Sequence, residues 1–128
     1  AKGMCVGPQN AEETEQTYDT LDKQMEDPYS IYNFVKQTIS IRNAFPEIAR
    51  GTNTFEKDLS NDNVCIFTRE YNGEKAVLMF NPSKDEASVD VSSLGVNDAV
   101  AMLQTTKKAP SYKDGTAKLP AYSVLVLK

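Results

Sequence analysis

The stretch VCIFTREYNGEKAVLMF, residues 64–80, decides the fold class of this chain. Two runs rich in β-branched and aromatic residues, 64–71 and 75–80, flank the pair Asn72-Gly73. Asn-Gly between two such runs is the strongest short-range signal for a β-hairpin, because a type I′ turn needs a positive φ angle at both central positions. The stretch therefore predicts two antiparallel strands joined by a two-residue turn.

Further short runs on both sides of this hairpin have strand character. Asn81-Pro82 ends the second hairpin strand, and Lys113-Asp114-Gly115 predicts another turn. Six or seven short strands separated by turns favour an antiparallel β-sandwich. The predicted strands outside the hairpin are residues 52–59 (an edge strand), 87–91, 99–103, 115–119 and 123–127.

One amphipathic helix is predicted before the strands, over residues 27–45. Asp27 is a good N-cap, Pro28 fits the first helical position, and Pro46 ends the helix. On a helical wheel the large apolar side chains fall in one arc of roughly 180°, so the helix is expected to cover a substantial surface. The residues of this arc are Ile31, Tyr32, Phe34, Val35, Ile39, Ile41 and Phe45.

Arg42 interrupts that apolar arc near its middle. A guanidinium is costly to bury unless it is paired. Either the side chain reaches past the helix end to water, or it meets a carboxylate or carbonyl groups of a partner body. No single acidic residue of this sequence is an obvious match.

Residues 1–26 are polar and without periodicity, which predicts a loop. A loop of this length is unusual in a compact domain and suggests a surface segment of some larger body. The first residue is Ala1, so we expect either a processed chain or a piece of a longer one. No signal peptide opens the chain, and no apolar run approaches the ~20 residues that cross a bilayer.

Composition excludes several classes of function. The 128 residues suggest one domain, and a net charge of −4 argues against a nucleic-acid partner. The sequence has no histidine, which removes the usual general base and most zinc sites. Cys5 and Cys65 are too few for a disulfide framework and are interpreted as free thiols.

Candidate chemical groups all have a simpler structural interpretation. The acidic residues lie in turns or at outward strand positions, which favours a solvated surface over an acid–base pair. Asn61-Asp62-Asn63 lacks the glycine and distal glutamate of a calcium loop. Tyr71, Tyr112 and Tyr122 lie beside turns and could form a sugar platform, although Tyr at a strand end is more often half-buried. We therefore assign no catalytic, cofactor-binding or metal-binding residue. The carboxylates considered are Asp58, Asp62, Asp85, Glu86, Asp90 and Asp98.

Residues 27–51, Asp27-Pro28-Tyr29-Ser30 through Pro46-Glu47-Ile48-Ala49-Arg50-Gly51, resemble the last barrel helix of the α-amylase family of glycoside hydrolases, family 13. The hairpin segment 67–81 and the closing segment 119–127 resemble that family's next domain, an antiparallel Greek-key β-sandwich called domain C. The resemblance implies that residues 1–50 end a (β/α)8 catalytic barrel and that residues 51–128 form the sandwich. The three catalytic carboxylates of the family would lie upstream of Ala1. Arg42 would then belong to a barrel helix with partners in the barrel.

The resemblance implies a non-catalytic C-terminal part of an α-amylase or α-glucosidase acting on starch or maltooligosaccharides. In that role the sandwich packs on the missing barrel and stabilises it. The α-glucan is then a partner of this chain only through the parent enzyme, which binds it as substrate. No cofactor, nucleic acid or membrane is expected. The sequence does not distinguish a secreted from a cytoplasmic parent enzyme. A free-standing carbohydrate-binding β-sandwich is the alternative, although the absence of Trp counts against it. A third possibility is an adhesin-like interaction sandwich.

Overall fold

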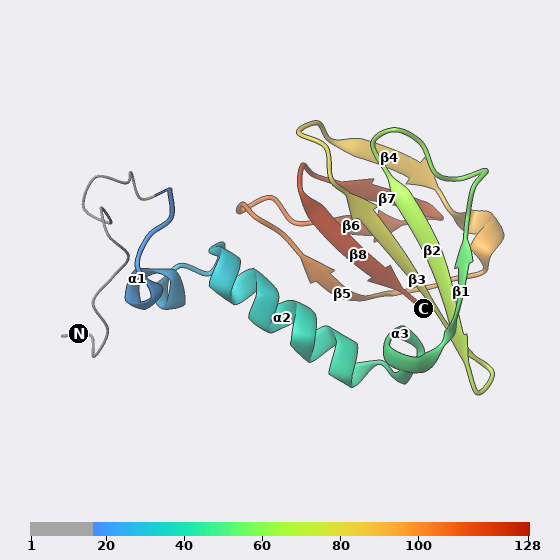
Figure 1. Cartoon of the computed structure of the whole chain (residues 1–128). Coiled ribbons are helices and arrows are strands. Elements are labelled where there is room, and N and C mark those ends of the chain that lie inside the picture. The colour runs from blue at the N-terminus through green and yellow to red at the C-terminus, as the bar shows by residue number, and fades with distance from the viewer. Residues whose placement is uncertain (1–16) are drawn as a thin grey trace.

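The computed structural model describes residues 17–128, which form two antiparallel sheets with helices along one side (Figure 1). Sheet A has the strand order β1-β2-β3-β8-β5, and sheet B has the order β4-β7-β6. The predicted mainly β sandwich fold is confirmed. The strands are β1 (Thr52–Phe55), β2 (Cys65–Tyr71), β3 (Glu74–Asn81), β4 (Ala87–Asp90), β5 (Ala99–Leu103), β6 (Ser111–Lys113), β7 (Thr116–Leu119) and β8 (Ser123–Leu127).

The hairpin that opened the sequence analysis forms as predicted. Its strands β2 and β3 pair from Tyr71 opposite Glu74 to Cys65 opposite Phe80. Asn72 and Gly73 have φ angles of 52° and 83°, which is the positive pair that a type I′ turn needs. The turn at Asp114-Gly115, with φ angles of 50° and 79°, joins β6 to β7 in the same way.

The strand order across the two sheets is that of a Greek key. Strands β6, β7 and β8 follow one another along the chain, and β5 lies beside β8. The sequence predicted all strands except β6, which has only three residues. The edge strand β1 is also shorter than the predicted segment 52–59, because residues 56–60 turn back on themselves through a hydrogen bond from Ser60 N–H to the Glu56 carbonyl.

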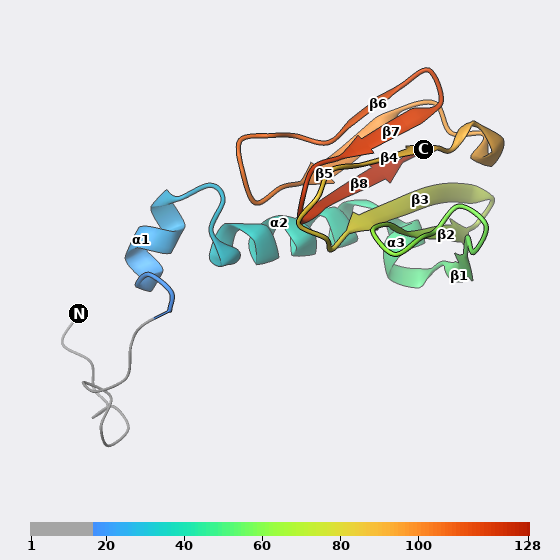
Figure 2. The same cartoon turned by 90° about the horizontal axis from the view of Figure 1, so that it is seen from above.

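The core lies between the two sheets and consists of aliphatic side chains. Alternate residues of β2, β3 and β8 point toward sheet B, as the period of two in a strand requires. Figure 2 shows the two sheets as separate layers, with the helices beyond sheet A. The buried core side chains are Val64, Ile66, Val77, Met79, Val91, Val96, Ala117, Leu119, Leu125 and Leu127.

The helical part differs from the prediction at both ends of the main helix. Helix α2 covers Ile31–Ala44, and its N-cap is Ser30, whose Oγ accepts a hydrogen bond from the Asn33 N–H. The predicted N-cap, Asp27, instead closes a turn by accepting from the Tyr29 N–H at 2.9 Å. Pro46 does end α2, but it is also the first residue of a further helix, α3 (Pro46–Arg50).

The predicted loop 1–26 is wrong over its last residues. Leu21–Glu26 form a short helix, α1, which packs on α2. Asn33 Nδ2 donates to the Gln24 and Asp27 carbonyls, at 3.0 and 2.8 Å, and so ties the end of α1 to the start of α2. Residues 1–16, which include Cys5, lie outside the described part of the chain.

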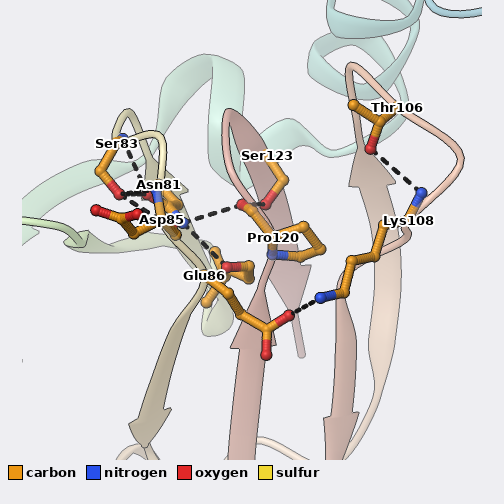
Figure 3. Close-up of polar contacts among 9 residues, drawn as sticks. Asn81, Ser83, Asp85, Glu86, Thr106, Lys108, Pro120 and Ser123 are labelled. Atoms are coloured by element: carbon orange, nitrogen blue, oxygen red, sulfur yellow. Dashed lines mark hydrogen bonds and ion pairs between the residues drawn. The ribbon is translucent and has the colours of Figure 1, made fainter.

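A buried amide holds together the end of the sandwich where β3 ends and β8 begins (Figure 3). Asn81 Nδ2 donates to the carbonyls of Asp85, Leu119 and Pro120 at 2.8–3.0 Å, and its Oδ1 accepts from the Ser83 N–H at 2.9 Å. Ser123 Oγ also donates to the Pro120 carbonyl, at 2.7 Å. These bonds link the β3–β4 and β7–β8 connections, and they satisfy polar groups that burial would otherwise make costly.

Candidate interaction surface

The apolar arc of α2 is divided between two environments. Phe34, Ile41 and Phe45 are half-buried, and α2 packs on β5 at the edge of sheet A. Ile31, Val35 and Ile39 are instead 53%, 49% and 54% exposed. Their spacing of four residues places them in one row, which we call the α2 stripe. A 14-residue helix with no buried residue is left with a large apolar side uncovered.

Helix α1 carries two more exposed apolar side chains. Leu21 and Met25 are both more than half exposed and lie four residues apart, on one side of α1. Figure 1 shows α1 continuing from the start of α2, away from the sheets. Rows of exposed apolar side chains, such as the α2 stripe, mark sites where another protein surface binds.

Arg42 lies in the exposed half of the arc, beside the α2 stripe. Its side chain is exposed, and it has no ion pair or hydrogen bond within residues 17–128. It stands at a hollow of about 180 Å³ between α2 and sheet A that is otherwise lined almost entirely by apolar atoms, including those of Ile41, Leu78 and Val126. The structure thus places a cation at the border between a packed and an uncovered apolar surface.

The outer face of sheet A is apolar as well. Phe55, Phe67 and Phe80 form a row across β1, β2 and β3, with ring centroids 5.3 and 6.2 Å apart. Helices α2 and α3 cover the part of this face over β2, β3, β8 and β5, and Phe55 on the edge strand stays 49% exposed. Sandwich strands commonly turn polar residues outward, so an apolar outer face indicates a surface built to be covered.

A charged cluster joins α3 to the sandwich. Glu47 is 3% exposed, and its Oε1 accepts from the Lys128 ammonium, which also donates to Glu74 Oε2 at 3.1 Å. On the other side of α3, Arg69 Nη2 donates to the Ile48 carbonyl at 3.0 Å. These contacts anchor the short helix to β2, β3 and the end of β8.

The pKa values of this cluster shift in the directions that pairing requires. The Lys128 hydrogen bond and the backbone N–H of Glu47 hold the pKa of the Glu47 carboxyl below its ordinary value, against the opposite effect of burial. The hydrogen bonds that the Lys128 ammonium donates to Glu47 and, to a lesser extent, to Glu74 raise the pKa of Lys128. Both groups are therefore charged at neutral pH.

A hollow of about 390 Å³ opens beside this cluster, between α3 and the β2–β3 hairpin. We call it the α3 hollow. Its walls are formed by Phe45, Glu47, Tyr71, Asn72, Glu74 and Lys128, among others. Sequence analysis did not single out Glu47, because its partner Lys128 is 81 positions away. The one available signal was an acidic residue directly after the helix-ending proline.

The carboxylates considered as acid–base candidates do not assemble into a pair. All six are exposed. Glu86 is paired with Lys108, which lowers the pKa of Glu86, and Asp90 accepts from the Ser92 hydroxyl at 2.6 Å. Asn61 Oδ1 accepts from the Asn63 and Val64 N–H groups, so the Asn61-Asp62-Asn63 segment is a hydrogen-bonded turn. Within residues 17–128 no three His, Cys, Asp or Glu side chains gather as metal ligands.

The three tyrosines do not share a surface. Tyr112 packs against the core, and its hydroxyl donates to the Val96 carbonyl at 2.8 Å. Tyr71 lies at the hairpin end of β2, whereas Tyr122 is exposed at the turn before β8, at the opposite end of sheet A. Cys65 is a half-buried free thiol on β2. None of the helices in the described residues is long and apolar enough to span a membrane.

Comparison with known proteins gives one family match. The family described as "Maltogenic Amylase, C-terminal domain" matches residues 58–126. No curated protein matches the chain.

Several solved structures share the fold. Eubacterium rectale Amy13B is 98% identical over 100% of this chain and 25% of that protein, with a TM-score of 0.92. The trehalulose synthase MutB from Pseudomonas mesoacidophila MX-45 is 23% identical, with a TM-score of 0.69, over 84% of this chain and 19% of that protein. The MutB F164L mutant, from crystals soaked with trehalulose, is 22% identical, with a TM-score of 0.70, over 85% of this chain and 20% of that protein. This chain thus spans a quarter or less of the length of these proteins.

Proposed function

Because this chain belongs to the family of maltogenic amylase C-terminal domains, within glycoside hydrolase family 13, we propose that its sandwich packs on and stabilises the catalytic barrel of a longer enzyme. The enzyme would act on α-glucosidic bonds of starch or maltooligosaccharides. In this proposal the chain itself carries no catalytic residue. Its contribution is to cover apolar barrel surface.

The observation that carries the proposal is the divided apolar arc of α2, whose Phe34 and Ile41 side packs on the sandwich while the α2 stripe stays uncovered. Ile31, Val35 and Ile39 leave a row of aliphatic side chains about half exposed on a helix without a buried residue. Burying such side chains stabilises a complex by roughly 25 cal/mol for each Å² of apolar surface removed from water. A longer protein offers a partner surface, and the chain spans only 25% of Eubacterium rectale Amy13B.

We propose that the boundary between barrel and sandwich falls between residues 50 and 51. Gly51 supports this position. A Cβ atom there would lie 2.4 Å from the Glu47 carbonyl oxygen and 2.9 Å from that of Glu70, so only glycine lets α3 approach β2 this closely. The close contact, together with the Glu47–Lys128 ion pair, would fix the orientation of the last helices on the sandwich.

Replacing the α2 stripe tests the proposal. The triple variant Ile31→Ser, Val35→Ser, Ile39→Ser is made in the longer enzyme and in the 128-residue chain. In the longer enzyme the variant should lower both the melting temperature and the yield of active protein. In the 128-residue chain the melting temperature should stay the same. The control variant is Lys36→Ala, Gln37→Ala, Ser40→Ala, on the polar side of the same helix. Equal losses from both triple variants in the longer enzyme would overturn the proposal.

A second experiment tests the non-catalytic role. The purified 128-residue chain is incubated with starch, maltooligosaccharides and a chromogenic α-glucoside, and released sugar is measured. We expect no turnover above the buffer blank. Turnover that disappears when a residue of this chain is replaced would contradict the proposed role.

A further inference from the structure

We propose that Asn72 is a site of spontaneous covalent modification, at which the side-chain amide is lost and part of the product is isoaspartate. Asn72-Gly73 is the only Asn-Gly pair in the sequence, and both residues are exposed. They form the turn of the β2–β3 hairpin, which projects from the end of sheet A in Figure 1. The reaction needs only water, and the inference holds whether or not the α2 stripe docks on a barrel.

The reaction begins with the backbone nitrogen of Gly73 as the nucleophile. It attacks Cγ of Asn72 and closes a succinimide ring, while the Cγ–Nδ2 bond breaks and ammonia leaves with the Gly73 amide proton. Water then adds to one of the two ring carbonyl groups. Opening at Cγ gives aspartate, whereas opening at the main-chain carbonyl carbon gives isoaspartate, in which the peptide chain runs through Cγ. Overall, one water is consumed and one ammonia is released, and nothing is oxidised or reduced.

The structure leaves the attacking nitrogen free to react. Within residues 17–128 the Gly73 N–H donates no hydrogen bond, so no bond has to break before the nitrogen loses its proton. A Cβ atom built on Gly73 would have nothing within 4 Å, which shows that the space around the turn is open. Glycine also has no side chain to hinder the approach of its nitrogen to Cγ, and it has the widest choice of backbone angles.

Other asparagines in the described part of the chain lack this combination. Asn97 is a useful comparison, because the N–H that follows it, that of Asp98, donates to the Lys128 carbonyl at 2.9 Å. Hydrogen bonds hold the side-chain amides of Asn33 and Asn81, and the residue after Asn81 is a proline, which has no N–H. We therefore expect the reaction to be fastest at Asn72.

The two products should differ in their effect on the hairpin. Aspartate fits the turn, since Asp114 precedes Gly115 in the other turn of this kind with the same pair of positive φ angles. Isoaspartate adds a carbon atom to the main chain, so a two-residue turn can no longer join β2 to β3 in the present register. Both products add a negative charge to the wall of the α3 hollow, which Asn72 lines together with Glu74.

Incubation of the 128-residue chain at mildly alkaline pH, followed by peptide mapping, tests the proposal. Trypsin cleaves after Arg69 and Lys75 and releases peptide 70–75, which contains Asn72 as its one asparagine. We expect this peptide to gain the mass of replacing NH₂ by OH and to separate into an aspartate and an isoaspartate form. Peptide 85–107, which contains Asn97, should stay unmodified and is the internal control. A sample digested without incubation gives the background.

Two variants identify the reacting groups. Gly73→Ala should slow the reaction about tenfold or more, because a methyl group hinders the nitrogen and narrows the backbone angles. The same variant weakens the turn, so a reaction limited by opening of the hairpin would become faster instead. Asn72→Gln should abolish the modification, since its longer side chain would have to close a larger ring. Asn72→Asp carries the new charge on an unaltered main chain and is the control for the isoaspartate form.

Hydrogen exchange separates the effect of the charge from that of the main chain. The isoaspartate form should lose protection of the β2–β3 amides next to the turn, whereas Asn72→Asp should keep it. Equal losses in both would overturn the proposed effect of the lengthened main chain.

The rate in urea tests whether the folded chain reacts. Unfolding should raise the rate by less than about tenfold, because the turn is already exposed and open. The proposal fails if peptide 70–75 is modified only in urea, or if it keeps its mass while peptide 85–107 is modified. It also fails if Gly73→Ala reacts as fast as the unsubstituted chain or faster.

Discussion

Gly73 and Gly115 occupy the same kind of turn and differ in what surrounds them. Both follow a residue with positive φ, and both have positive φ themselves. A Cβ atom on Gly73 would have nothing within 4 Å, whereas one on Gly115 would lie 2.8 Å from the Ser92 Cβ atom. Backbone strain therefore acts at both positions, and a steric clash acts only at Gly115.

Alanine substitution should separate these two effects. Gly73→Ala is expected to destabilise the chain by about 1–2 kcal/mol, the cost of a side chain in the left-handed region, and Gly73→Val by the upper end of that range or more. Gly115→Ala should cost more than Gly73→Ala, because the new methyl group clashes with Ser92. Chemical denaturation measures both values. In a Ser92→Gly background the excess at Gly115 should shrink, and an unchanged excess would contradict the steric explanation.

The Glu47–Lys128 pair predicts a pH window for stability. Because the pKa of Glu47 is lowered in the folded state, its contribution is present above its unfolded value of about 4.3 and is lost as the pH falls through the folded value. Because the pKa of Lys128 is raised, its contribution is full below about 10.4 and is lost as the pH rises through the folded value. The pair therefore stabilises the fold between these limits.

Lys128→Met checks this window. The variant should have a lower melting temperature than the unsubstituted chain at neutral pH, since Glu47 stays buried without its partner. The difference should shrink as the pH falls below about 4.3 and through the lowered folded-state pKa of Glu47, and as it rises above about 10.4 and through the raised folded-state pKa of Lys128. Lys108→Met, in the exposed pair with Glu86, is the control. A difference that does not depend on pH would show that Lys128 acts through packing alone.

At the scale of elements, α2 shows what a helical pattern can and cannot predict. The apolar arc identified the helix, because spacing along one chain fixes which side chains share a face. The arc could not reveal that Phe34 and Ile41 pack on the sandwich while Ile31 and Val35 stay exposed. That division depends on where α3 holds the end of α2 against sheet A, through contacts between residues far apart in sequence.

Prolines and short segments account for the elements that the sequence did not predict. Pro46 predicts a helix end, but proline is equally suited to a first helical position. In the structure it does both, because α2 ends just before it and α3 begins with it. Helix α1 and strand β6 have six and three residues, too few for a periodic pattern to stand out. The hairpins were predictable because their signal, two turn residues between apolar runs, is entirely local.

The link between α1 and α2 rests on Asn33, and Asn33→Leu tests it. The amide donates to carbonyl groups at the end of α1, including those of Gln24 and Asp27, and a leucine cannot donate. We expect α1 to lose protection against hydrogen exchange, with a local cost of about 0.5–1.5 kcal/mol for each lost hydrogen bond. Asn43→Leu, on the exposed end of α2, should leave α1 protected. Equal exchange in both variants would mean that apolar contacts with α2 hold α1.

On the scale of the whole molecule, sheet A is apolar on both faces. Its inner face closes the core with residues such as Ile66 and Met79. Its outer face carries Phe67, Leu78 and Phe80, partly covered by α2 and α3. Figure 2 shows the resulting arrangement as sheet B, sheet A and the helix layer. The α2 stripe is an exposed apolar row of the helix layer, which is why a fourth layer from a longer protein fits the pattern.

Arg42 provides a test of that fourth layer. It lies in the exposed half of the α2 arc, beside apolar side chains that the proposed barrel would cover. Covering them would also bury the guanidinium, which would then need a carboxylate or carbonyl partner from the barrel. In the 128-residue chain the guanidinium remains in water, so Arg42→Met should leave the melting temperature nearly unchanged.

In the longer enzyme the same substitution should be strongly destabilising. Removing one member of a buried ion pair costs about 3–5 kcal/mol, because the other charge stays buried without compensation. Arg50→Met, at an exposed position of α3, controls for the general effect of replacing an arginine by methionine and should be mild in both proteins. Thermal unfolding of the four variants and their parents measures the difference. Equal losses from Arg42→Met in the chain and in the longer enzyme would place the partner of Arg42 within these 128 residues, and the α2 stripe would then need a different explanation.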